Sequence, residues 1–347
     1  MTTVAIVILN YNGGHFLERF LPGVIQFSAG CRVVVADNGS TDSSVVLLHS
    51  HFPEVTVIRL GKNEGFCKGY NLALQQVEAQ YYILLNSDVE VTPGWVKPLV
   101  GLMEANPRMG ACQPKIKSFD RRHCFEYAGA AGGWLDKWGY PFCRGRIFGV
   151  LEEDQGQYDD TAEVFWASGA CLCIRSSLYH SLGGLDNDFF AHMEEIDLCW
   201  RMKKRGYGVF YCGGSEVYHV GGGTLPKSDP RKTFLNFRNG LALLYKNLPR
   251  RRLIRILFIR LLLDGMAGVK FLLEGSPANT WAVVRAHFSF YANFRRWQLK
   301  RSQELVLTEY ETLDGLYSGS VVYAHFIRGK KTFGQVITYP AVSTLLQ

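Results

Sequence analysis

The feature that most constrains the fold is the alternation of short apolar runs with helix-length segments over the first hundred residues. Turn or polar residues follow each of the runs rich in Val, Ile and Leu, which occupy 4–9, 32–36, 55–60 and 81–85. Between them lie segments of helical length and period, at 14–27, 43–51 and 68–79. This order predicts an α/β fold with a mostly parallel sheet and helices on its faces.

In parallel sheets of this kind, ligands bind where the carboxyl ends of the strands meet. Asn10, Asp37, Asn63 and Asp88 follow successive strands, so we expect them around one crevice. A carboxylate such as that of Asp37 can accept the N3 proton of a uracil or thymine ring. The residues after Asp37 also fit an Asx turn and a helix N-cap, which would explain them without a ligand.

Asp88 follows the fourth apolar run and is expected to expose its carboxylate at the same crevice. Mg²⁺ and Mn²⁺ keep several waters and use few protein ligands, so one carboxylate and the oxygens of a diphosphate suffice to hold such an ion. A polar strand end before Pro93 is the simpler alternative.

An acidic cluster formed by Glu194, Glu195 and Asp197 is predicted at the start of a helix. The helix dipole favours carboxylates in a first turn, so a capping role explains some of them. Three acids within four residues also repel one another. Burial beside such neighbours raises a carboxyl pKa, which a general base can exploit.

His219 is followed by the glycines at 221–223. A single histidine is more often structural than a ligand, but three glycines let backbone amides approach a phosphate closely. The chain has neither a Walker loop nor a GxGxxG fingerprint.

Two domains are expected, at 1–235 and 236–347. Residues 110–174 are rich in glycine and aromatic residues, and we expect irregular strands and loops that complete the sheet and shape an acceptor pocket. After about Arg231 the pattern is typical of helices with apolar and basic faces, separated by breaks at Pro249 and 275–277.

The net charge of +7 is concentrated in the second domain, because residues 246–301 hold twelve Lys or Arg and only two acids. This basic region predicts contact with an anionic surface, either a membrane or a nucleic acid. Packing of the apolar positions on the catalytic domain, with solvated arginines, is the alternative. We expect no nucleic acid, since no recognisable nucleic-acid module accompanies the charge.

Localisation is expected to be cytoplasmic, with peripheral attachment to the inner face of the plasma membrane. Nine cysteines without a CxxC pair are typical of a reducing compartment. The N-terminus lacks the features of a signal peptide, and no uncharged apolar run reaches 18 residues.

In their order and spacing, the motifs resemble those of family 2 inverting glycosyltransferases of the GT-A (Rossmann-like) fold, and most closely the bacterial rhamnosyltransferase-like branch. The resemblance covers roughly residues 3–245. It is carried by VILNYNG at 7–13, ADNGSTD at 36–42, NEGF at 63–66, LNSDV at 85–89, GGLD at 183–186, EEIDLCWR at 194–201 and FRN at 237–239.

The resemblance implies a nucleotide-sugar site in which Asp37 binds the base. Asp88 matches the last acid of the DxD metal motif, and His219 the downstream metal or diphosphate contact. The motif's first acid is replaced by Asn86, which can still bind a ribose hydroxyl but brings no charge. The expected nucleotide-sugar contacts are Asn10, Asp37, Asn63, Gly65, Asn71, Asn86 and Ser87.

The family's catalytic Glu-Asp pair maps onto Glu194 and Glu195, so a glutamate stands where the family usually has aspartate. The additional methylene shifts the carboxylate by about a bond length, which matters for positioning. We take Glu195 as the base and Asp197 as the alternative.

The implied activity is metal-dependent transfer of a sugar from a nucleoside diphosphate, of UDP or dTDP type, to a glycan or lipid-linked acceptor, with Mg²⁺ or Mn²⁺ as cofactor. Cell-surface polysaccharide or glycolipid assembly is the expected process. Two other classes remain open: a nucleotidyltransferase, although the turn after the first strand holds only one basic residue, and a nucleotide-sugar-binding protein without turnover.

Overall fold

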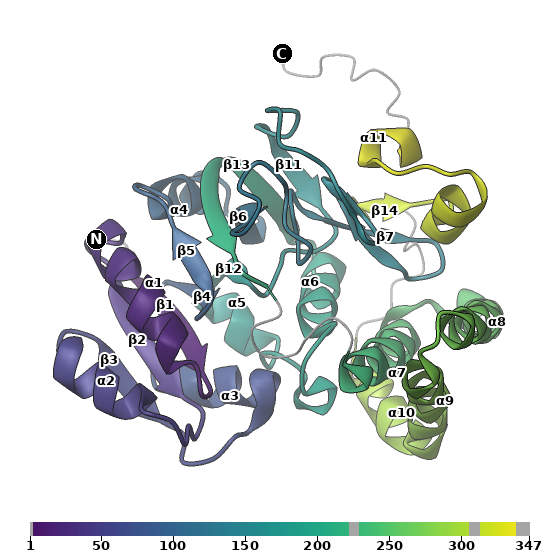
Figure 1. Ribbon diagram of the computed structural model, residues 1–347, viewed down its shortest axis with the longest axis horizontal. Helices are drawn as coiled ribbons and strands as arrows, with labels where there is room; N and C mark the ends of the chain where they lie inside the picture. The colour runs from purple at the N-terminus through teal and green to yellow at the C-terminus, as the bar shows by residue number, and fades with distance from the viewer. Residues whose placement is uncertain (1–2, 222–228, 305–312, 338–347) are drawn as a thin grey trace.

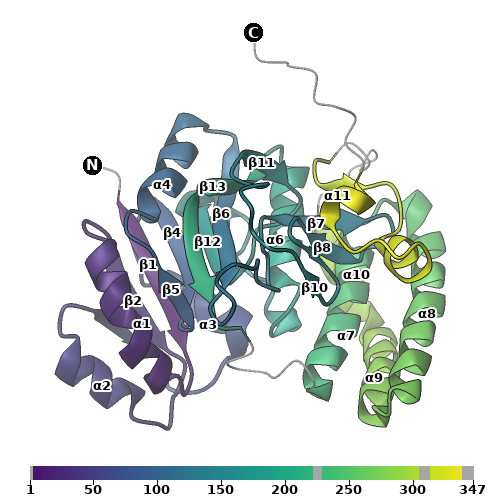
Figure 2. The same ribbon diagram turned by 45° about the horizontal axis from the view of Figure 1, so that its top comes forward.

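A computed structural model describes residues 3–221, 229–304 and 313–337. Within these ranges, nine strands form a large sheet in the order β11-β13-β6-β12-β4-β1-β2-β3, and β5 pairs with β13 (Figures 1 and 2). Its strands are β1 (Val4–Asn10), β2 (Arg32–Asp37), β3 (Thr56–Arg59), β4 (Tyr81–Asn86), β5 (Val89–Val91), β6 (Met109–Ser118), β11 (Thr161–Val164), β12 (Cys171–Arg175) and β13 (Gly208–His219).

The N-terminal half of this sheet has the predicted topology. Strands β3, β2, β1 and β4 are all parallel. Alternate residues of β1 face opposite sides: Ala5 and Val7 pack with α3 (Gly65–Leu74), and Ile6 and Ile8 pack with α1 (Gly14–Phe27). A strand with both faces buried has a continuous apolar sequence, which is the pattern that made it recognisable.

Antiparallel pairing in the other half brings distant residues to the edge where the parallel strands end. Strand β12 runs antiparallel to both β4 and β6. Strand β5 pairs with the end of β13, so that His219 is in register with Val89, the residue after Asp88. The predicted active-site edge therefore receives residues from three parts of the chain.

A second, smaller sheet was not predicted. Residues 110–174 were expected to complete the main sheet, and β6, β11 and β12 do so, but residues 133–151 do not. They form instead β7 (Gly133–Asp136), β8 (Pro141–Cys143), β9 (Arg146–Ile147) and β10 (Val150–Leu151), which pair with one another. The far edge of β7 is filled by β14 (Leu316–Tyr317), which runs parallel to it. These strands of two to four residues are too short to give a readable alternation.

The C-terminal part is helical as far as Gln303, with the predicted breaks at Pro249 and 275–277 and a further, unpredicted break at Asn293 between its helices. They are α7 (Pro230–Asn247), α8 (Arg250–Leu273), α9 (Pro277–Ala292) and α10 (Phe294–Gln303). The domain boundary predicted at 235/236 falls inside α7, which begins at Pro230 because the Asp229 side chain accepts the Arg231 amide as an N-cap. Residues 313–337 then return to the second sheet, where α11 (Phe333–Val336) packs.

None of the helices in these described ranges is long and apolar enough to cross a bilayer. All nine cysteines carry free thiols, and only Cys31 is not buried.

Candidate active site

The first part of the site lies where β1 and β2 end side by side, with Asn10 in register with Asp37. Both side chains are buried, and each keeps an Oδ1 atom that is shielded from solvent and has no hydrogen-bond partner. Asp37 Oδ2 accepts the Ser40 amide at 3.2 Å, so the Asx turn considered from the sequence is present. Because the turn uses only one carboxylate oxygen, the other remains available to a ligand that donates a proton.

Asn63 and Gly65 shape the entry to α3. Asn63 Oδ1 accepts the Gly65 amide at 2.9 Å. Gly65 has φ +79°, and a Cβ there would lie 2.6 Å from the Phe190 ring, so both conformation and space require glycine. These two predicted residues therefore fix the backbone conformation at the start of α3.

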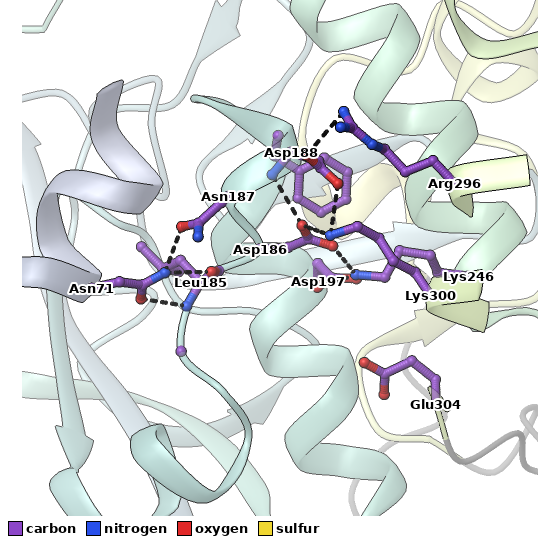
Figure 3. A network of polar contacts seen from close by, with 12 residues as sticks. Asn71, Leu185, Asp186, Asn187, Asp188, Asp197, Lys246, Arg296, Lys300 and Glu304 are labelled. Carbon is purple, nitrogen blue, oxygen red and sulfur yellow. Dashed lines mark hydrogen bonds and ion pairs between the residues drawn. The ribbon is translucent and has the colours of Figure 1, made fainter. Parts of the chain in front are cut away.

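Asn71 ties α3 to the loop before the acidic helix (Figure 3). Its Nδ2 donates to the Leu185 carbonyl at 2.7 Å and to Asn187 Oδ1, while its Oδ1 accepts the Leu185 amide and the Tyr179 hydroxyl. Both ends of the amide are thus occupied by protein groups.

The next predicted residues are Asn86, which ends β4 in the centre of the sheet, and Ser87, which follows it. Asn86 is half-buried, and its backbone N–H donates to the Ala170 carbonyl at 3.0 Å. In register it neighbours Leu9, one residue before Asn10. The N-terminal wall of the site and the central strand therefore adjoin.

Asp88 and His219 meet as a buried pair, with 3.1 Å between Asp88 Oδ1 and His219 Nε2. Glu126 lies on the other side of the imidazole, its Oε2 3.2 Å from His219 Nδ1, outside hydrogen-bond geometry. Burial alone would lower the pKa of His219, but the Glu126 and Asp88 carboxylates outweigh it and raise this pKa to about 10. Burial opposes ionisation of both acids, yet the His219 charge holds the pKa of each below its usual value.

This pair suits a hard divalent cation that is completed by phosphate oxygens. The Asp88 oxygen and the His219 nitrogen are 3.1 Å apart, a separation that one ion can bridge when it displaces the proton of the imidazole. Within the described residues, no group of three or more His, Cys, Asp or Glu could hold a metal alone. Few protein ligands are expected where a bound diphosphate supplies the others.

Helix α6 (Glu194–Lys204) begins with the predicted acidic cluster. Glu194 and Glu195 each keep a buried Oε2 without a hydrogen-bond partner. Burial raises the pKa of Glu195 to about 7, and burial together with the Glu195 charge raises the pKa of Glu194 well above its usual value. Such a carboxylate can accept a proton near neutral pH.

Asp197 has a different environment from its two neighbours. Its Oδ2 binds Arg201 Nε at 2.8 Å and Lys246 Nζ at 2.9 Å, and its Oδ1 accepts from Asn247 at 2.9 Å. Burial opposes its ionisation, but Lys246 and Arg201 more than compensate and hold its pKa far below the usual range. Lys246 also binds Asp186 Oδ2 at 2.6 Å, which joins α6 to the preceding loop (Figure 3).

The acidic helix adjoins the same edge of the sheet. A Cβ on Gly169 would lie 3.9 Å from Glu195 Cβ, and the next residue, Ala170, accepts the Asn86 amide. Asn86 is two residues before Asp88, which places the Asp88–His219 pair at the same edge. The strand-end residues, the Asp88–His219 pair and Glu195 therefore share one region.

Two contributions were missed from the sequence. Glu126 lies in a loop after β6 and only tertiary packing brings it to His219, so no local pattern marks it. Arg238 and Asn239 belong to a recognised motif but were given no role; their contacts with the segment before α6 are described below.

The sheet order, with an acid–histidine pair and a second acid at one edge, is that of the GT-A fold. Two solved structures share this fold. GalNAc-T7, solved with UDP, GalNAc and Mn²⁺, has a TM-score of 0.54 and 17% identity, with 72% of this chain and 49% of that one covered. The mannosyltransferase PcManGT from Pyrobaculum calidifontis, solved with GDP-Man and Mn²⁺, has a TM-score of 0.51 and 14% identity. The match covers 86% of this chain and 84% of that one.

Sequence comparison finds related proteins. Residues 5–156 match the family model of glycosyl transferase family 2. The N-acetylglucosaminyl-diphospho-decaprenol L-rhamnosyltransferase of Mycobacterium tuberculosis is 28% identical over 229 residues, covering 62% of this chain and 75% of that protein. The dTDP-rhamnosyl transferase RfbF of Shigella flexneri is 23% identical over 233 residues, covering 62% and 72%.

Proposed function

We propose that this protein is an inverting glycosyltransferase that moves a sugar from a nucleoside diphosphate to an acceptor hydroxyl in cell-surface polysaccharide or glycolipid assembly. The observation that carries the proposal is the Glu195 carboxylate, whose Oε2 is buried without a hydrogen-bond partner, at the sheet edge that also holds Asp88 and His219. A base and an anion-neutralising centre at one edge are what a single displacement at the anomeric carbon requires.

In this mechanism Glu195 takes the acceptor hydroxyl proton while the hydroxyl oxygen attacks C1 from the side opposite the diphosphate. Because this is one displacement, the anomeric configuration inverts and no covalent intermediate forms on the protein. Asp197, kept as an alternative base from the sequence, is a poor candidate because both of its oxygens are bound and its pKa is lowered.

Asp88 and His219 would hold a Mg²⁺ or Mn²⁺ ion, and the Glu126 carboxylate lies 3.2 Å from the other imidazole nitrogen. Such an ion supplies neutralisation of the charge that develops on the leaving diphosphate. Asp37 and Asn10 present unpaired oxygens to the nucleobase and ribose. A uracil or thymine ring, with its N3 proton, fits the free Asp37 oxygen.

For the donor we favour a dTDP-linked deoxyhexose, with UDP-sugars as the second choice, because two similar proteins are named as rhamnosyltransferases. For the acceptor we favour a lipid-linked glycan. The decaprenol-linked acceptor in one of these names is the support for that choice.

The test is a transfer assay with a panel of nucleoside diphosphate sugars and Mn²⁺. We expect turnover with one donor, loss on chelation, and recovery on adding Mg²⁺ or Mn²⁺. Glu195→Gln should abolish transfer and leave nucleotide binding nearly intact, while Asp88→Asn should weaken metal-dependent nucleotide binding. Donor binding without transfer by the wild type would favour a non-catalytic protein, and reaction of sugar phosphates with nucleoside triphosphates would favour a nucleotidyltransferase.

We also propose that the C-terminal helices bind an anionic membrane surface. On α8 the large apolar side chains that turn to solvent recur every three or four residues, so they form one face. Exposed apolar side chains are also present on α9. Ile254 and Leu273, which lie at the two ends of the face on α8, are 82% and 83% exposed. Its other members are Phe258, Leu261, Leu262, Met266, Val269, Leu272, Trp281, Phe288 and Tyr291.

Arginines border this apolar face, since Arg250, Arg251 and Arg255 are exposed at the start of α8 and Arg285 on α9. An apolar face with cationic residues fits the interface of a bilayer that contains anionic lipid. A symmetric dimer through the same face is less favourable, because it would bring like charges together.

Flotation with phosphatidylglycerol vesicles tests this contact. Binding should be strong at low salt and weaker with phosphatidylcholine alone, and replacing Ile254 and Phe288 by Ser should remove it. Val46→Ser, which changes an exposed apolar residue on α2 (Ser44–His51), is the matched control. Absence of flotation together with concentration-dependent dimerisation would show that a second copy covers the face.

A further inference from the structure

The segment that leads into α6 is held almost entirely by groups from elsewhere in the chain. Asn239 Nδ2, on α7, donates to the carbonyls of Phe189, Ala191 and His192 at 3.0, 2.9 and 2.7 Å. Arg238 donates to the Asp188 and Phe189 carbonyls. The remaining Phe190 carbonyl accepts the amides of Phe66 and Cys67 from α3. Donors from α7 and α3 thus bind all five consecutive carbonyls at 188–192.

This segment has a conformation that its own residues disfavour. Phe190, His192 and Met193 have φ values of 67°, 69° and 71°, although none of them is glycine. Residues in this region are strained and keep it only when surrounding contacts impose it. Glu194 and Glu195 follow immediately, so the backbone path through 190–193 sets where their carboxylates lie.

Asn239 is well suited to impose this path. It is fully buried, and its Oδ1 accepts Arg238 Nε at 2.8 Å, which fixes the orientation of the amide so that its Nδ2 faces the segment. An aspartate in the same place could still accept from Arg238. Its second carboxylate oxygen, however, would replace the Nδ2 donor and face the three carbonyl oxygens, which would repel it.

We propose that Asn239, oriented by Arg238, is a positioning residue that clamps the strained segment 188–193 and thereby aims the Glu195 carboxylate at the acceptor. The clamp also connects α7, the first of the C-terminal helices, to the catalytic base. The proposal rests on the assignment of Glu195 as the base made under Proposed function.

The test compares Asn239→Asp and Arg238→Lys with a control on the same helix. Thr233→Ala removes the 2.7 Å bond from Thr233 Oγ1 to Asn279 Oδ1, which joins α7 to α9 and does not involve the segment. Three quantities are measured for each full-length variant: kcat with the donor found above, affinity for dTDP and UDP with Mn²⁺, and hydrogen exchange of amides 188–197.

We expect Asn239→Asp to lower kcat by about 100-fold, because small displacements of a catalytic group have effects of this size. Nucleotide affinity should change by less than about 3-fold, and exchange should accelerate in the segment. Arg238→Lys, which keeps the positive charge, should show a smaller fall in kcat. It serves as the test variant if Asn239→Asp shows no cooperative thermal unfolding and is therefore misfolded. Thr233→Ala should match the wild type in kcat and in exchange of this segment.

Wild-type kcat in both clamp variants, or wild-type exchange of 188–193, would overturn the clamp. A fall in nucleotide affinity as large as the fall in kcat would also overturn it, since it would indicate general loss of structure. These results differ from failure of the proposed function, in which Glu195→Gln itself keeps its turnover.

Discussion

At the residue scale, Glu194 and Glu195 are two adjacent acids whose pKa values are both raised by burial. A negative charge on Glu195 favours the protonated form of Glu194, so the two acids lose their protons at different pH values. The replacement of the usual aspartate by Glu195 therefore leaves a group with a pKa suited to proton abstraction near neutrality.

This environment predicts the acid limb of the pH profile. With a pKa of about 7, Glu195 is protonated and inactive at lower pH, so kcat should rise with pH and level off above about 8. At pH 6 it should be about one tenth of the plateau value. Steady-state rates at saturating donor and metal between pH 5 and 9 measure it. A limb centred near 4.5 would show that the base is an ordinary exposed carboxylate.

The predictable part of the site consists of residues that end strands. Asn10, Asp37 and Asp88 could be placed at one edge because parallel strands share a direction, and the structure brings them there with His219. Glu126 could not be found this way, because its partner is 93 positions away in the sequence and its own loop has no regular pattern. The difference between Glu195 and Asp197 was also hidden, since it depends on Lys246 and Asn247 of another helix.

At the scale of elements, α7 joins the catalytic part to the C-terminal helices through buried charge. Lys246 is almost fully buried and binds both Asp186 and Asp197. Two acids that share one lysine depend on it, because without it each is left near a like charge in a medium that solvates charge poorly.

Lys246→Met should therefore destabilise the protein by about 3–5 kcal/mol, the usual cost of removing one partner from a buried ion pair. Lys270→Met, which breaks an exposed pair with Glu274 on α8, should cost less than about 1 kcal/mol. Urea unfolding of both variants gives the comparison. Equal, small effects would mean that Asp186 and Asp197 are adequately held by Arg201, Asn247 and Lys300.

The elements themselves were predictable to different degrees. Strands β1 to β4 were found within one or two residues, because each is an apolar run of four to seven residues between clear turns. The helix predicted at 68–79 lies at 65–74. It begins earlier than predicted because Gly65, with its positive φ, is already the first residue of the helix. The small sheet at 133–151 could not be predicted, because its strands are brief and one partner comes from the far end of the chain.

At the scale of the whole molecule, the last described segment is part of the core. The Phe333 side chain is 1% exposed and lies among Trp134, Phe142 and Tyr158, with ring centroids 5.3 to 6.2 Å apart. Phe333→Ala should cost about 3–5 kcal/mol, as for other buried aromatic residues. Denaturant unfolding measures the loss, and a cost below about 1 kcal/mol would show that this segment is only loosely attached.

The pairing of β14 with β7 has a consequence for how the protein is made. Leu316 pairs with Leu135, about 180 residues earlier. During synthesis about 180 residues must therefore follow β7 before this edge strand can find its neighbour, and closing so long a loop is slow. Until then β7 has an open edge that other nascent chains can pair with. The yield of active protein should therefore depend on how quickly translation proceeds from the codons of β7 to those of β14.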